Sequence, residues 1–133
     1  MTLPTGTAEA HFPNEGSSAG AARRFVTVSL QAWGLEGLED VACLLVSELA
    51  SNVVLHAGTE LDVHLRRADG RLRVEVHDGS SRMPERKFYS PTSTTGRGLV
   101  FLAKLAQTWG TEPTGAGKVV WFELDEAAAA AAP

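Results

Sequence analysis

Glu48 and Asn52 are the first residues of this chain whose types and spacing suggest chemistry. They lie in the apolar run from Val41 to Ala57, which predicts a buried helix. Because they are four residues apart, their side chains share one face of that helix. A buried carboxylate and amide need partners, and their oxygens suit a cation such as Mg²⁺ that keeps several waters and meets a phosphate. The alternative is a core pair whose hydrogen bonds are satisfied by a neighbouring loop.

A predicted hairpin places a second carboxylate at the end of a strand. Two runs of alternating apolar residues flank Asp69-Gly70, a dipeptide that favours a two-residue turn. This turn fixes the register, so that Leu65 faces Val74 and Asp78 falls on the same, core-facing side. A carboxylate there needs a hydrogen-bond donor, and the amino group of a bound ring would serve.

The outer side of the same hairpin carries histidines opposite carboxylates. The register places His64 opposite Glu75 and Asp62 opposite His77. Such pairs are predicted to be cross-strand charge partners. A metal site formed by these histidines is the alternative.

A long connection leads from the hairpin to a glycine-rich helix start. The segment from Gly79 to Thr95 has little periodicity, which is typical of a lid or a binding loop. It is followed by Gly96-Arg97-Gly98-Leu99, at the start of a predicted helix. Backbone N–H groups and the positive end of the helix dipole make such a start an anion site. A simple tight turn is the alternative for these glycines.

The remaining elements complete one domain. They are an edge strand near Phe12, a helix that Ser18 begins and Gly34 ends, the buried helix from Asp40 to Gly58, a helix from Leu99 that carries Trp109 and is capped by Gly110, and a strand from Lys118 to Leu124. Residues 1–17 are predicted to be flexible, and the alanine-rich tail 125–133 is predicted to be disordered. The predicted domain therefore spans residues 18–124.

The composition excludes several classes of protein. The 133 residues are enough for one domain with its own core. The net charge of −4 and the scattered arginines do not suggest nucleic-acid binding. The chain shows no signal peptide and no apolar stretch of membrane-spanning length, and its single cysteine, Cys43, favours a reducing compartment. We therefore expect a soluble cytoplasmic protein that binds neither nucleic acid nor a membrane.

In this order, the candidate groups describe a site for a purine nucleoside triphosphate. The chain resembles the GHKL-type ATP-binding domain of histidine kinases, DNA gyrase, heat-shock chaperones of the ninety-kilodalton class and MutL. More closely, it resembles the bacterial anti-sigma-factor serine/threonine kinases. The segments that carry this resemblance are Ala22–Val26, Ser47–Ala57, Val76–Asp78, Gly96–Leu99, Trp109-Gly110 and Gly117–Leu124.

This resemblance implies a fold and a set of residue roles. The fold is an α/β (α+β) two-layer sandwich, with three helices on one face of a mixed, mostly antiparallel sheet. The resemblance implies that Asn52 coordinates Mg²⁺, that Glu48 positions or deprotonates the attacking hydroxyl, and that Asp78 accepts a hydrogen bond from the adenine amino group. The residues implied to close on the phosphates of ATP are Gly96, Arg97, Gly98 and Leu99.

Two positions depart from the family pattern. Ser80 stands where the Asp-x-Gly-x-Gly box has its first glycine, and Val119 stands where the family has Thr or Ser after Gly-Lys. The second change predicts the loss of a hydrogen bond near the base, worth about 1 kcal/mol. Three functions stay open: a kinase that sequesters a sigma factor and phosphorylates an antagonist protein on serine, a nucleotide-binding regulatory module that acts by partner binding, and a structural domain with a degenerate site. A homodimer is also left open.

Overall fold

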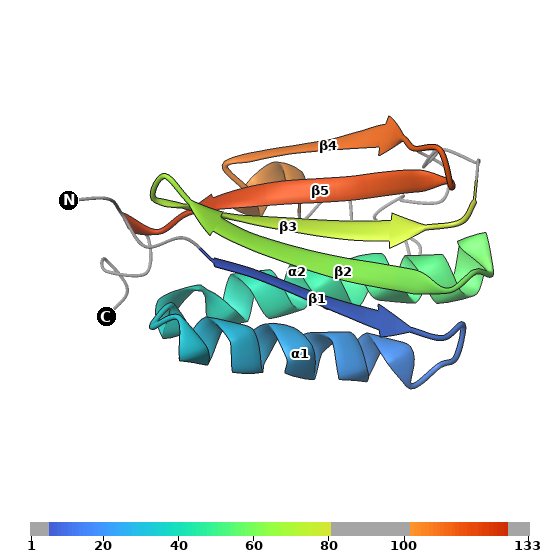
Figure 1. Cartoon of the computed structure of the whole chain (residues 1–133), viewed down its shortest axis with the longest axis horizontal. Helices are drawn as coiled ribbons and strands as arrows, with labels where there is room; N and C mark the ends of the chain where they lie inside the picture. Colours follow the sequence, from blue (N-terminus) through green and yellow to red (C-terminus); the bar gives the residue numbers. More distant parts are fainter. Residues whose placement is uncertain (1–5, 81–101, 128–133) are drawn as a thin grey trace.

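The computed structural model describes residues 6–80 and 102–127. Within these residues, five strands form one sheet in the order β1-β2-β3-β5-β4, and every pairing is antiparallel. The strands are β1 (Gly6–Phe12), β2 (Leu61–Ala68), β3 (Arg71–Asp78), β4 (Thr108–Pro113) and β5 (Lys118–Asp125). The helical elements are α1 (Ser18–Ala32), the 3₁₀ turn η1 (Glu36–Leu38), α2 (Glu39–Asn52), the π turn η2 (Val53–Ala57) and residues 102–105. Helices α1 and α2 lie on one face of the sheet (Figure 1), which confirms the predicted two-layer sandwich.

The core lies between the helices and the inner face of the sheet. Helix α1 buries Ala22, Val26 and Leu30, which recur every four residues and form one stripe. The buried residues that the central strands contribute are Leu61, Val63, Leu65, Leu72, Val74, Val76, Val120, Phe122 and Leu124. Side chains alternate along each strand, so the intervening residues lie on the outer face, which no described helix covers.

The hairpin of β2 and β3 has the predicted register. Asp69 and Gly70 have φ angles of 56° and 75°, as the two-residue turn requires. Leu65 pairs with Val74, and Asp78 ends β3 on the core side, where it is only 6% exposed. The sequence pattern and the turn together are sufficient to place this carboxylate.

The predicted buried helix exists, but its last turn is not α-helical. Helix α2 ends at Asn52, and the π turn carries the chain to Gly58, whose φ of 67° closes the segment as predicted. Single π turns inside helices are frequent at functional sites. Here the change in helical geometry follows directly after the predicted metal ligand.

The prediction that Trp109 and Gly110 end a helix is wrong. Residues 102–105 are helical, but both residues belong to β4. Gly110 pairs with Trp121 on β5, and a Cβ at residue 110 would lie 2.8 Å from the Trp121 ring. Gly110 therefore marks a close approach between a strand and an aromatic ring, and it is not a helix cap.

The described chain extends beyond the predicted domain at both ends. The edge strand expected near Phe12 is β1, which begins at Gly6. It therefore lies before residue 18, where the predicted domain begins. At the other end, Glu126 Oε1 lies 3.1 Å from Arg67 Nη2. The residues from 81 to Thr95, the segment 96–99 and the tail from 128 lie outside the described residues. No helix in the described ranges is long and apolar enough to cross a membrane.

Candidate functional site

Helix α2 presents Glu48 and Asn52 on one buried face, as the sequence predicted. Glu48 is 9% exposed and Asn52 is 4% exposed, and they are one helical turn apart. The helix forms here because apolar residues surround these positions and Glu39 and Asp40 stabilise its first turn. The same apolar surroundings hold the carboxylate and the amide away from bulk water.

The side-chain amide of Asn52 has no hydrogen-bond partner among the described residues. Both its Oδ1 and its Nδ2 are buried and unpaired. A buried polar group without a partner costs about 1–3 kcal/mol of stability. A cation at Oδ1 and an acceptor at Nδ2 would remove this cost. The role predicted for this amide is that of a metal ligand, and an oxygen donor one helical turn from a carboxylate suits a hard cation such as Mg²⁺.

Asp78 lies on β3, against which α2 packs, and both oxygens of its carboxylate are engaged. Oδ1 accepts the Ser80 N–H at 2.8 Å. Oδ2 lies 2.7 Å from Nζ of Lys118, and the two side chains are only 1% and 7% exposed. The two charged groups form an ion pair, but the lysine N–H groups are not aligned for a hydrogen bond to Oδ2. A carboxylate has about four acceptor positions, so a bound base would share this group with the Ser80 N–H and with the ammonium group.

Lys118 is the residue of this site that the sequence prediction missed. It is the first residue of β5 and pairs directly with Asp78 across the sheet. The chemical signal was present, since a buried carboxylate requires a cation or a donor. The pairing of β3 with β5 was not predicted, so no local feature connected the two residues.

The same register corrects the expectation for Val119. Val119 pairs with His77 on the outer face, whereas Lys118 pairs with Asp78 on the inner face. A strand turns successive side chains to opposite faces, so Val119 cannot contact the carboxylate. A side chain at residue 119 therefore does not assist Asp78 in the way that the family pattern implied, and Lys118 is the residue that contacts this carboxylate.

Gly117 allows the turn between β4 and β5 to close over the end of β3. A Cβ at residue 117 would clash with the carbonyl oxygen of Asp78 and lie 2.7 Å from the Gly79 backbone. Only glycine fits such an approach without a backbone shift. Residue 80 is serine where the family pattern has glycine. The close packing at this end of the site comes instead from Gly117 on the opposing turn.

The chain matches the model of the histidine kinase-like ATPase domain over residues 12–124. The chain belongs to this family. No curated protein matches it. Membership in the histidine kinase-like ATPase family implies nucleotide binding.

The ATPase domain therefore brings three predicted site residues onto two packed elements. Glu48 and Asn52 come from α2, and Asp78 comes from β3. The predicted phosphate contacts of Gly96, Arg97, Gly98 and Leu99 lie outside the described residues and stay predictions. In the part of the site that the structure describes, Asn52 can hold a cation, and Glu48 is the carboxylate beside it. Asp78 can accept a hydrogen bond from a bound donor that shares the carboxylate with Lys118.

Proposed function

We propose that this ATPase domain binds Mg·ATP at the buried face of α2 and acts as an anti-sigma-factor-like regulator. In this proposal it sequesters a sigma factor and phosphorylates an antagonist protein on serine. It does so in the cytoplasm, as a monomer or a homodimer, and binds neither nucleic acid nor a membrane itself. The nucleotide part is carried by one observation, the unpaired buried amide of Asn52 in a histidine kinase-like ATPase domain. The partner part is supported by the sequence resemblance.

Each residue has a separate task in this proposal. Asn52 Oδ1 would ligate Mg²⁺, which when bound supplies positive charge to the phosphates. Asp78 would accept a hydrogen bond from the adenine amino group. Glu48, one turn from the metal ligand, would face the attacking hydroxyl. The predicted phosphate contacts are Gly96, Arg97, Gly98 and Leu99.

The transfer itself requires positioning and charge neutralisation more than covalent chemistry by the protein. The serine oxygen of the antagonist forms a bond to the γ-phosphorus, while the bond from that phosphorus to the β,γ-bridging oxygen breaks and ADP leaves. The serine proton passes to the carboxylate of Glu48. A base and a metal ligand on one helical face meet this requirement.

The second candidate is a nucleotide-binding module without turnover, and the ion pair between Asp78 and Lys118 favours it. The ammonium group 2.7 Å from Oδ2 neutralises the charge of the carboxylate, so Asp78 would be a weaker acceptor for the amino group of a base. Weak nucleotide binding would be sufficient to gate the capture of a partner, but it would not support rapid phosphoryl transfer.

Incubation with γ-labelled ATP and a candidate antagonist distinguishes the two candidates. We expect label on the antagonist with the wild-type chain and loss of the label with Glu48→Gln. Glu36→Gln is the matched control, because Glu36 is exposed on η1. Nucleotide binding and sigma-factor capture without transfer to any antagonist would favour the binding module.

A further inference from the structure

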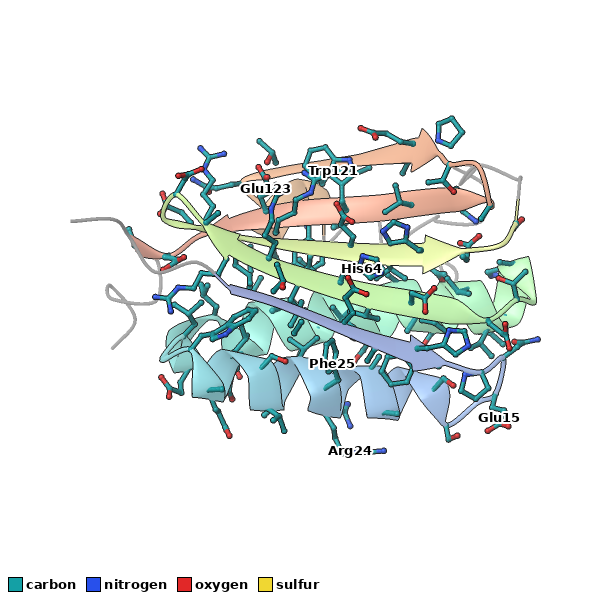
Figure 2. The ribbon with its side chains drawn as sticks, in the orientation of Figure 1. Glu15, Arg24, Phe25, His64, Trp121 and Glu123 are labelled. Atoms are coloured by element: carbon teal, nitrogen blue, oxygen red, sulfur yellow. The ribbon has the colours of Figure 1, made fainter. Side chains whose placement is uncertain are left out.

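The outer face of the sheet carries histidines and carboxylates in an alternating array across three strands. The register of β1, β2 and β3 produces two neighbouring rows, Glu9–His64–Glu75 and His11–Asp62–His77. Three of the four histidines of the chain therefore lie on one face. In Figure 2, His64 lies on the sheet with Trp121 and Glu123, apart from α1, which carries Arg24 and Phe25. The array lies on the face opposite the core-facing side chain of Asp78, although His77 directly precedes Asp78 and both residues line one pocket at the end of β3.

Within the array, His64, Glu75 and His77 each bring one ligand atom to within 4.8 Å of the others. Glu75 Oε1 lies 2.9 Å from His77 Nε2 and 3.9 Å from His64 Nδ1. Zinc bonds of about 2.0–2.2 Å at a tetrahedral angle separate neighbouring ligand atoms by about 3.4 Å. The two observed distances lie on either side of this value, so adjustments of about half an ångström would bring these two pairs to it. The ligand nitrogens of His64 and His77 lie within 4.8 Å of each other.

The three side chains are both held in place and accessible. Two hydrogen-bonded strands fix their Cα positions, and the imidazole rings of His64 and His77 are stacked with centroids 4.4 Å apart. The exposed fractions of the side chains are 36% for His64, 26% for Glu75 and 29% for His77. A metal ion can therefore reach the ligand atoms from solvent, and a water can complete the coordination.

A hydrogen bond from Arg73 orients Glu75. Arg73 Nε donates to Oε2 at 2.8 Å, which leaves Oε1 directed to the histidines. Arg73 itself lies 4.2 Å above the Trp121 ring and contacts Glu123 Oε2 at 3.3 Å, so its charge is shared with a second carboxylate. Burial raises the pKa of Glu75, but hydrogen bonds from Arg73 and His77 outweigh this effect and lower it below its ordinary value. Outer partners of this kind fix the orientation of metal ligands.

We propose that His64, Glu75 and His77 form a site for a divalent transition metal ion of the zinc class on the outer face of the sheet. Two imidazole nitrogens and one carboxylate oxygen, with an open position for water, are a donor set that suits Zn²⁺, whereas Mg²⁺ prefers oxygen ligands. Metal binding breaks the hydrogen bond between His77 and Glu75, and any proton on Nε2 moves to Nδ1 or is released. The ion links β2 to β3 and stabilises the hairpin.

Zinc titration of the metal-free full chain, without nucleotide, tests this site. Calorimetry in buffer that does not chelate should show one equivalent of Zn²⁺ bound, with no competition by millimolar Mg²⁺. His64→Gln, Glu75→Gln and His77→Gln should each weaken binding roughly tenfold or more. His11→Gln is the matched control, because His11 has its own carboxylate partner on the same face, Asp62 at 2.7 Å, and lies outside the three ligands.

Melting curves in EDTA verify that each variant folds before it is titrated. As a second measurement, the imidazole NMR signals of His64 and His77 should shift on addition of one equivalent of Zn²⁺, while those of His56 stay unchanged. Absence of zinc binding would overturn the proposal, as would equal loss of affinity in His11→Gln or full affinity in His64→Gln. None of these outcomes bears on the nucleotide site, because the measurement contains no nucleotide.

Discussion

Replacing Lys118 by methionine tests the buried ion pair with Asp78. Two opposite charges 2.7 Å apart interact by about 6 kcal/mol at an effective dielectric constant of about 20. Desolvation offsets part of this energy in the wild type. In Lys118→Met the carboxylate stays buried, and among the described residues the Ser80 N–H is its one remaining donor, so we expect a loss of about 3–5 kcal/mol in the free energy of unfolding.

Urea unfolding at neutral pH measures this loss, with Lys104→Met as the matched control. Lys104 is exposed, so its variant should change the free energy of unfolding by less than about 0.5 kcal/mol. Adding Asp78→Asn to Lys118→Met removes the unpaired charge and should recover part of the loss. A cost below about 1 kcal/mol for Lys118→Met, or no recovery in the double variant, would refute the buried pair.

Two further predictions concern the end of β3 and the outer face. Gly117→Ala should destabilise the chain by about 1–3 kcal/mol in urea unfolding, because its Cβ would clash with the Asp78 carbonyl. Gly115→Ala is the control and should not destabilise the chain, because nothing lies within 4 Å of a Cβ there. Equal effects of the two substitutions would contradict the close approach at Gly117. The hydrogen bond to Asp62 raises the pKa of His11, although desolvation lowers it. The stabilisation from this pair is therefore full below about pH 6.5, and it is lost as the pH rises through the raised pKa of His11. NMR titration should show the His11 pKa fall in Asp62→Asn, and an unchanged value would disprove the pairing.

Local patterns were sufficient for the parts of the fold that depend on neighbouring residues. The Asp69-Gly70 turn fixed the hairpin register, and with it the core-facing position of Asp78. The spacing of Glu48 and Asn52 on an apolar helix predicted their shared buried face. In each case, the periodicity of one element determines where its side chains lie.

Contacts between distant segments could not be predicted in the same way. Trp109 and Gly110 continue the helical spacing of the preceding apolar residues, and only the pairing of Gly110 with Trp121 places them in a strand. Lys118 is forty residues from Asp78, and their contact depends on the pairing of β3 with β5. The sequence contains both residues but no local feature that joins them.

The proposed function requires nucleotide binding that depends on Mg²⁺ through Asn52, and calorimetry measures this dependence. Wild-type protein and Asn52→Ala are titrated with ATP and with ADP at millimolar concentration, once with Mg²⁺ and once with EDTA. We expect binding to the wild type, a rise in melting temperature with ligand, and a loss in Asn52→Ala that is larger with Mg²⁺ than with EDTA. No heat and no melting shift with either nucleotide, or an equal loss with and without Mg²⁺, would contradict the account.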